Sequence, residues 1–253
     1  MNLSSKSSFP PRSLIAAGIA VFIVVCGLLS LGVWQLQRLA WKNDLIARVD
    51  ARVHAVPVPA PGPDQWPDIS RENDEYRRVS VSGTFQHDRE TLVQAVTELG
   101  AGFWVLTPLV DDRGDAILIN RGFVPSDRRL PESRAAGQID GAVTVTGLIR
   151  ITEPKGAFLR DNDPVADKWY ARDVAAIAEA RDLGDTAPYF IDADGTPNPG
   201  DYPRGGLTRI SFPNTHLIYA LTWFSMAVIA AAMFIGFYRH SRREYQRRLD
   251  NRR

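Results

Sequence analysis

The sequence contains a single cysteine, Cys26. One thiol cannot close a disulfide within the chain, and it cannot build a cysteine-type zinc site or hold an iron–sulfur cluster. An excess of charge of one sign is also missing, because 30 basic and 29 acidic side chains leave a net charge of +1. No overall basic field therefore indicates a nucleic-acid partner. The apolar content of 45% excludes a disordered or collagen-like chain.

The common enzyme signatures are also missing: the sequence has no G-x-S-x-G elbow, no H-E-x-x-H and no P-loop. No two of its histidines stand at metal-ligand spacing. His87-Asp88 follows an expected strand, and a solvated turn explains it better than a catalytic dyad. Asp111, Asp112 and Asp115 lack the spacing and the terminal Glu of an EF-hand, so a plain turn is favoured over a Ca²⁺ site. We therefore expect a protein that is not an enzyme.

Two long runs without a charged side chain stand out, at residues 14–36 and 217–238. A helix of either length spans about 33 Å, and the hydrocarbon core of a bilayer is about 30 Å thick. The first run is longer than the apolar region of a signal peptide, and no A-x-A-like cleavage site follows it. We predict two transmembrane helices, the first an uncleaved anchor.

Charge at the two ends of the chain predicts the orientation. The tail 239–253 holds seven arginines against two carboxylates, a net charge of +5, and residues 1–13 add Lys6 and Arg12. The segment 37–216 holds 21 basic and 27 acidic side chains. Because positive charge stays inside, we expect cytoplasmic termini and a periplasmic domain at 37–216. The start is too short for an organelle transit peptide, which favours a bacterial inner membrane.

The segment between the runs reads as ordinary soluble protein. Residues 38–54 have helical spacing and continue the first span, and the prolines of 57–67 then form an extended linker. Beyond the linker, apolar residues alternate with polar ones, as in strands. The expected strands are 76–84, 91–96, 103–110, 116–124, 142–149, 189–192 and 207–212.

Two local signals complete the predicted domain. Residues 111–115 read as a hairpin turn, and a helix at 174–181 has Asp173 as its N-cap. The predicted fold class is α+β, with two transmembrane helices flanking a mostly antiparallel, β-rich periplasmic domain or open barrel.

The start of the second run carries the clearest candidate residues. Asn214 or Thr215 can cap a helix there. His216, Tyr219 and Trp223 then lie at i, i+3 and i+7, on one helix face. Tyr, Trp and His often anchor the ends of membrane helices, and a histidine there can also be a ligand. Composition alone leaves both readings open.

Short blocks in a fixed order link these features. They are WQLQRLAWK at 34–42, VSVSGTF at 79–85, GFWVLTP at 102–108, NRGFVP at 120–125, and PNTH at 213–216 followed by TWF at 222–224. Together they resemble the motifs of the Surfeit locus protein 1 family, assembly factors of cytochrome c oxidase. The resemblance covers nearly the whole chain. Thr215 departs from the family's frequent Asn and leaves His216 in place.

The resemblance implies a protein that holds or delivers haem a to the catalytic subunit of the oxidase. Bacterial relatives are associated with haem a binding through the second-span histidine, which is His216 here, as an axial iron ligand. The implied partners are the catalytic subunit and haem a synthase. The alternative is a membrane scaffold that stabilises oxidase subunits and never touches haem.

Further residues are expected around His216 on this reading. Trp223 and Tyr219 would lie beside the porphyrin, and Arg38, Lys42 and Arg209 would pair with its propionates. The plainer reading of these cations is snorkelling at a span end.

Arg121 is a candidate in the middle of the domain. It could pair with a buried carboxylate or with a propionate, or it could only maintain the fold.

Overall fold

The computed structural model describes residues 12–154, 160–208, 210 and 212–250. The chain forms two compact units. One is built from Met1–Ala47 and Ser211–Arg253, and we call it the helical pair. The other is Arg48–Ile210, which we call the barrel domain. Each unit is described separately below.

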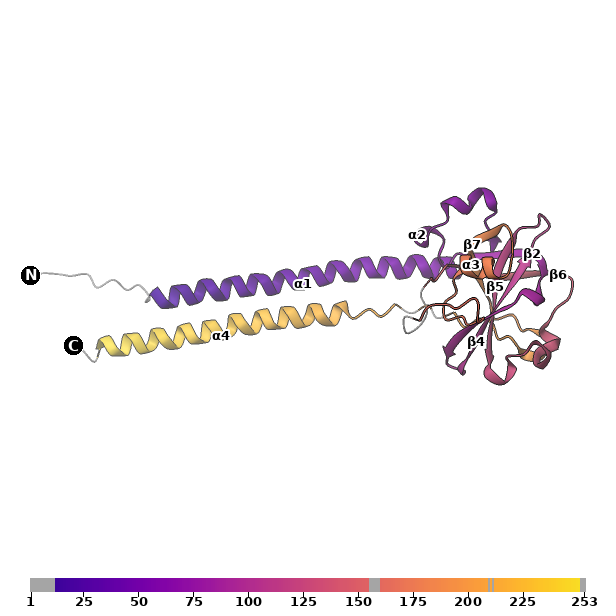
Figure 1. Cartoon of the computed structure of the whole chain (residues 1–253). Coiled ribbons are helices and arrows are strands. Elements are labelled where there is room, and N and C mark those ends of the chain that lie inside the picture. Colours follow the sequence, from indigo (N-terminus) through magenta and orange to yellow (C-terminus); the bar gives the residue numbers. More distant parts are fainter. Residues whose placement is uncertain (1–11, 155–159, 209, 211, 251–253) are drawn as a thin grey trace, which may run out of the picture. The chain divides into compact units, whose positions relative to one another are not determined.

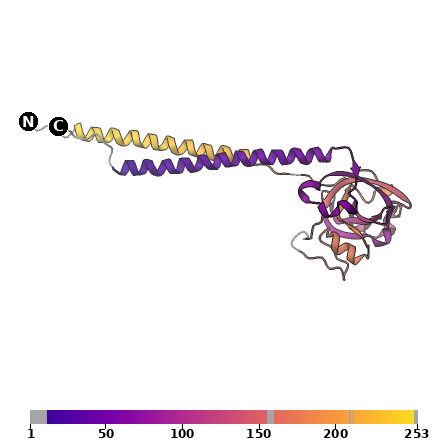
Figure 2. The same ribbon diagram turned by 90° about the horizontal axis from the view of Figure 1, so that it is seen from above.

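Two long helices, α1 (Arg12–Val53) and α4 (His216–Asp250), form the helical pair and run side by side (Figures 1 and 2). Small residues on α1 allow close contact with aromatic rings of α4. A Cβ placed on Gly32 would lie 2.5 Å from the Phe224 ring, and one on Gly18 would lie 3.2 Å from Phe234. Close packing at small residues is how membrane helices associate, since lipid supplies no hydrophobic drive between them.

Both helices are long and apolar enough to cross a membrane, over Leu14–Val53 and His216–Arg247. The chain is therefore a membrane protein. The helix predicted at 38–54 is confirmed, because α1 continues without a break to Val53. In the same way α4 continues past the apolar run into the arginine-rich tail.

Seven strands form one sheet in the barrel domain. They are β1 (Val58–Pro59), β2 (Arg78–Phe85), β3 (Thr91–Thr97), β4 (Gly100–Val110), β5 (Ala116–Pro125), β6 (Ala142–Ile151) and β7 (Thr186–Ala193). Strands β2, β6, β7, β5 and β4 pair in that order, and a short β2–β4 pairing closes them into a barrel. The pairings β1–β2 and β5–β7 are parallel, and the others are antiparallel. The predicted α+β class is confirmed.

Strand β5 is buried on both faces because two apolar clusters share it. Ile117 and Ile119 point into a cluster that includes Tyr189. Ala116 and Leu118 point the opposite way, into a cluster with Trp169 and Phe190 beside helix α3 (Val174–Ala180). A strand covered on both faces reads as a near-continuous apolar run, which is the pattern of the sequence here.

The short elements differ more from expectation. The predicted helix cap is confirmed, since Asp173 accepts a hydrogen bond from Ala176 N. The proline-rich linker is extended only in part, because Pro63–Asp68 forms the 3₁₀ helix η1. A one-turn helix, α2 (Arg71–Asp74), follows it and was not predicted. The remaining 3₁₀ turns are η2 (His87–Arg89), η3 (Ser126–Arg128), η4 (Pro131–Gly137) and η6 (Pro199–Asp201).

The strand predicted at 207–212 is wrong for the residues that the structure describes there. Leu207 and Thr208 form no ladder, and residues 209 and 211 lie outside the described residues. The physical reason is that the hydrogen bonds of this segment do not follow the regular backbone pairing of a strand. Gly206 N donates to Ala193 O over 3.1 Å, and the Thr208 hydroxyl donates to Asp192.

A second segment approaches β5 so closely that only glycine fits. Gly122 has φ +127°, and a Cβ there would collide with the backbone carbonyl of Arg204. The neighbouring Phe123 exchanges two backbone hydrogen bonds with Arg204, over 2.8 and 2.9 Å. The glycine therefore allows this crossing chain to dock on the barrel wall.

We expect Gly122→Ala to lower the free energy of unfolding by about 3 kcal/mol, because it adds a backbone clash to an unfavourable φ. Gly141→Ala is the matched control, since Gly141 also has a positive φ (+83°) and nothing lies near its Cβ position. We expect about 1 kcal/mol there. Urea unfolding followed by tryptophan fluorescence measures both. Equal losses in the two variants would contradict the close docking.

Candidate functional site

His216 opens α4, and its half-buried imidazole contacts α1. The carbonyl of Thr215 accepts from Ile218 N at 3.1 Å and from Tyr219 N at 3.3 Å, so Thr215 occupies the position that precedes the helix. The side chain of Asn214 does not cap the helix. Its Nδ2 donates instead to Asn43 Oδ1 of α1, over 2.8 Å.

A buried glutamine of α1 orients the imidazole. His216 Nδ1 lies 2.7 Å from Gln35 Oε1, and Gln35 is 9% exposed. Because an amide oxygen only accepts hydrogen bonds, Nδ1 carries a proton, and in the neutral imidazole this tautomer leaves the lone pair on Nε2. Metal-ligating histidines are held in this way, with the second ring nitrogen donating to an oxygen that fixes the tautomer.

Gln35 belongs to the WQLQRLAWK block at 34–42, and the sequence alone assigns it no role. Its signal was present, because it is a polar side chain at the end of an uncharged 14–36 run. Polar side chains in membrane helices usually face a partner. The identity of the partner was not readable, since His216 lies 181 residues away.

The other predicted site residues of α4 point in two directions. Trp223 is half-buried, like His216, on the side that carries the buried Ala220 and Ala227. Tyr219 is 54% exposed and turns away from that side. The structure thus brings His216 and Trp223 to the contact between the helices and leaves Tyr219 outside it.

The predicted cations on α1 contact aromatic rings. Lys42 Nζ lies 5.6 Å from the centre of the Phe212 ring, four residues before His216. The exposed Arg38 stacks on Trp41 at 4.6 Å. Arg209 lies outside the described residues.

One polar atom close to His216 in the sequence does not form a hydrogen bond within the described part of the chain. The side-chain oxygen of Asn214 is buried, and it has no hydrogen-bond partner among the described residues. A buried acceptor without a donor costs free energy, so this position can accept a hydrogen bond from an additional group. We use the term His216 cluster for Gln35, Lys42, Asn43, Asn214 and His216.

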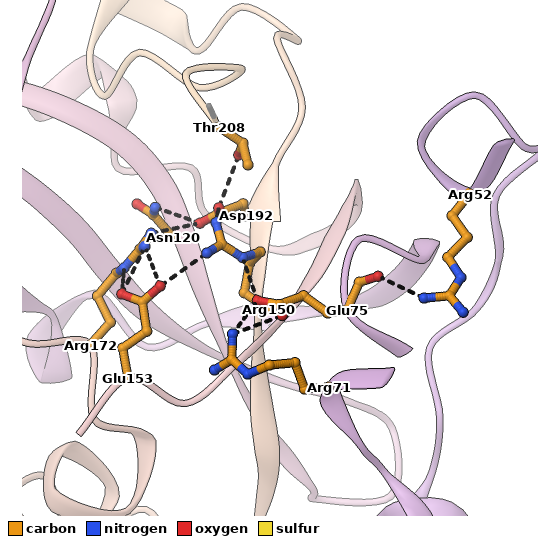
Figure 3. Close-up of polar contacts among 9 residues, drawn as sticks. All are labelled: Arg52, Arg71, Glu75, Asn120, Arg150, Glu153, Arg172, Asp192 and Thr208. Atoms are coloured by element: carbon orange, nitrogen blue, oxygen red, sulfur yellow. Dashed lines mark hydrogen bonds and ion pairs between the residues drawn. The ribbon is translucent and has the colours of Figure 1, made fainter. Parts of the chain in front are cut away.

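A second polar cluster lies in the barrel domain (Figure 3). Several of its residues line a pocket of about 410 Å³. Asp192 is 3% exposed and accepts four hydrogen bonds. They come from Asn120 (2.7 Å), Arg172 (3.2 Å), Arg150 (3.0 Å) and Thr208 (2.9 Å). Burial opposes the charge of Arg150, but Asp192 and further carboxylates outweigh that effect and raise its pKa.

Glu153 completes this second cluster by bridging both guanidiniums, at 2.9 Å from each. Both oxygens of Asp192 are therefore saturated by protein donors. Arg172 pairs with two carboxylates, and Arg150 pairs with three, which are Asp192, Glu153 and Glu75. The cluster has the composition of a structural network that joins strands. Its acceptor Asp192 is fully used, whereas the buried Nε of Arg150 has no hydrogen-bond partner among the described residues and lies 3.5 Å from Glu75 Oε1.

Arg121 also serves the fold. It is 2% exposed, and burial lowers its pKa to about 10. Its guanidinium stacks on Phe85 at 4.7 Å, donates to the carbonyl of Gly137 and lies 3.5 Å from His87 Nδ1. The structure records no ion pair of Arg121 with a described carboxylate, so the expected carboxylate partner is not found there. His87 is engaged as well, since its Nε2 lies 3.0 Å from Ile139 O.

The hairpin turn at 111–115 is confirmed. Asp111 Oδ1 accepts from Arg113 N at 2.9 Å and from Asp115 N at 3.1 Å. Burial raises the pKa of Asp111, but these bonds and the Arg113 guanidinium outweigh it, so the pKa is lowered overall. No group of three or more potential metal-binding side chains occurs within the described ranges.

Comparison with known proteins places the chain in a family. The model described as "SURF1 family" matches residues 21–228. The chain belongs to the SURF1 family. This family is implicated in cytochrome c oxidase assembly, and its assembly factors are not enzymes. The expected family and the expected lack of an enzymatic reaction are both confirmed.

Individual relatives agree with this assignment. The chain is 38% identical to Surfeit locus protein 1 of Rattus norvegicus over 229 residues, which cover 84% of this chain and 72% of the relative. The human protein is also 38% identical, over 82% of this chain and 72% of its own length. A SURF1-like protein of Monosiga brevicollis is 38% identical over 92% of both chains.

The network around Asp192 yields a stability prediction. Asp192→Ala should lower the free energy of unfolding by about 3–5 kcal/mol, because the Arg150 and Arg172 guanidiniums lose the more deeply buried of the two carboxylates that they share. Arg71→Gln is the control, since it removes a cation from the 60%-exposed side of the same network, where it pairs with Glu75. We expect less than about 1 kcal/mol for it. Urea unfolding of the full chain measures both losses, and a small loss for Asp192→Ala would contradict the structural role of this cluster.

Proposed function

We propose that this SURF1 family member holds haem a on His216 and delivers it to the catalytic subunit of cytochrome c oxidase. The observation that carries the proposal is the 2.7 Å hydrogen bond between His216 Nδ1 and Gln35 Oε1. Axial ligation of iron requires an imidazole nitrogen with a free lone pair. The bond to Gln35 leaves Nε2 in that state and limits rotation of the ring.

The surroundings of His216 suit an apolar cargo with polar edges. Trp223 is half-buried on the same side of α4 and offers an aromatic surface to a porphyrin ring. The buried oxygen of Asn214 has no donor among the residues that the structure describes, and it can accept a hydrogen bond from the cargo. Tyr219, with an exposed phenol, is available to the outer edge of the same ligand.

Positively charged side chains near the start of α4 are the proposed partners of the haem propionates. Lys42 has a weak contact with the Phe212 ring, and pairing with a carboxylate is stronger than a cation–π contact at an exposed site. It lies seven residues after Gln35, on the same face of α1. Arg38 and Arg209 are further candidates by their places in the sequence.

Delivery needs partners and a location. We propose the oxidase catalytic subunit as acceptor and haem a synthase as donor, in a bacterial inner membrane. Net charges of +5 on the tail and −6 on residues 37–216 support cytoplasmic termini and a periplasmic domain. The proposed divisions are the N-terminus 1–13, the spans 14–36 and 217–238, the domain 37–216 and the tail 239–253.

The first prediction for this site concerns the ligand. His216→Ala should abolish the Soret band of the detergent-purified protein made together with the haem a pathway, because the axial nitrogen is removed. His240→Ala is the matched control, since it is an exposed histidine of the same helix that pairs with Glu244. It should leave the spectrum unchanged. Arg38→Ala, Lys42→Ala and Trp223→Ala should weaken haem retention without shifting the band.

Two results would contradict the ligand assignment. A His216→Ala protein with full haem and an unchanged spectrum would make the histidine an interfacial anchor. A wild-type protein that is colourless under these conditions but still supports oxidase assembly would favour the scaffold function.

The second prediction concerns Gln35 as a positioning residue. Gln35→Leu removes the acceptor that orients His216 and should lower haem affinity about 10- to 100-fold, as loss of an outer partner does at other metal sites. Gln35→Glu keeps an oxygen at the same distance and should restore binding. Haem titration followed by the Soret band, with helix content checked by circular dichroism, measures both. If both variants lost affinity equally, Gln35 would act only in helix packing.

A further inference from the structure

The arginine-rich end of α4 bears a groove that the proposed function does not use. Residues 239–250 extend the helix beyond its apolar run. An open groove of about 570 Å³ runs along this end, and the described residues that line it all belong to α4. Its first half is apolar, with Phe234, Ile235 and Tyr238, and its second half is basic. The basic side chains are those of Arg239, Arg242 and Arg243.

The positive charge of the groove is not neutralised within the described part of the chain. The three guanidiniums are exposed, and no ion pair is recorded for any of them there. The nearest acid along the helix, Glu244, pairs with His240 over 3.4 Å. At 100° per residue, that pair lies on the side of α4 opposite the groove. Three like charges thus share one concave surface without a counter-ion.

We propose that this groove binds an anionic glycerophospholipid. The three guanidiniums would hold the headgroup phosphodiester, since arginine forms charge-assisted, often bidentate bonds with phosphate oxygens. The acyl chain would lie along Phe234 and Ile235. Tyr238 stands between the two halves, where amphipathic rings favour the membrane interface.

Along the groove, apolar side chains come first and basic side chains follow, and this order favours a lipid over a free anion or an acidic peptide. The apolar run of a membrane helix ends at Tyr238, and the arginines follow in the next two turns. A phospholipid beside this helix changes from apolar to anionic in the same direction. Free phosphate would occupy the basic half alone and leave the aromatic half unused. Basic residues just beyond a membrane span are attracted to anionic lipid headgroups.

The test compares two arginines of the same tail. The full chain in non-ionic detergent is titrated with phosphatidylglycerol or phosphatidylcholine, and bound lipid is counted by native mass spectrometry. The wild-type protein should retain more phosphatidylglycerol than phosphatidylcholine. Arg242→Gln, in the centre of the groove, should lower this retention about five-fold. Arg247→Gln makes the same change in net charge outside the groove lining, and it should leave retention nearly unchanged.

Other outcomes would overturn the proposal. Equal losses in the two variants would mean a general attraction to the basic tail, and no loss in either would mean that lipid binds elsewhere. Displacement of the lipid by equimolar glycerol phosphate would identify a free-anion site. Binding that appears only after deletion of residues 2–11 would mean that this segment, and not lipid, occupies the groove. Circular dichroism of each variant confirms that the helix is intact.

Discussion

The barrel domain depends on one buried carboxylate, that of Asp192. It stands on β7 and receives hydrogen bonds from β5 through Asn120 and from β6 through Arg150. Arg172 and Thr208 bring two further segments to the same two oxygens. A buried carboxylate is tolerated only when it is paired and hydrogen-bonded. The four hydrogen bonds therefore compensate the burial of Asp192, and each partner holds the segment that carries it against β7.

In the helical pair, too, a buried polar group needs a partner, although the surrounding solvent there is lipid. In an apolar environment a polar side chain needs a partner inside the protein. Gln35 and His216 satisfy each other across the two helices, and Asn43 and Asn214 form a second link near the same end. Contacts of aromatic rings on glycines bring the helices together, while these polar links fix their register.

Patterns along the chain predicted the local elements well. Alternation located β2 through β7 to within a few residues, and the uncharged runs located both long helices. What the sequence did not show was closure. The barrel closes through only two β2–β4 residue pairs, and β7 inserts parallel to β5. Neither feature leaves a periodic signal, because register and neighbours depend on contacts between distant segments.

The residues of the candidate site also fall into those that the sequence indicated and those that only the fold revealed. His216 and Trp223 were readable, because a ring nitrogen and an indole at the start of an apolar helix are unusual enough to single out. The role of Gln35 and the neutral Nε2 of His216 required the fold, since they depend on one contact between two helices. The expected strand at 207–212 failed for a related reason. Its alternation is real, but Thr208 bonds through its side chain to the Asp192 carboxylate, and Leu207 and Thr208 form no backbone ladder.

Saturation of the acceptor oxygens separates Asp192 from the His216 cluster. The oxygens of Asp192 accept two bonds each, so an incoming ligand would have to break a buried ion pair before it could bind. The His216 cluster differs, because Nε2 keeps a lone pair and the buried Asn214 oxygen has no partner among the described residues. Unmet capacity costs stability in an isolated chain. A group that completed those bonds would recover that free energy, and for this reason we propose the His216 cluster as the binding site although the barrel domain holds more charged side chains.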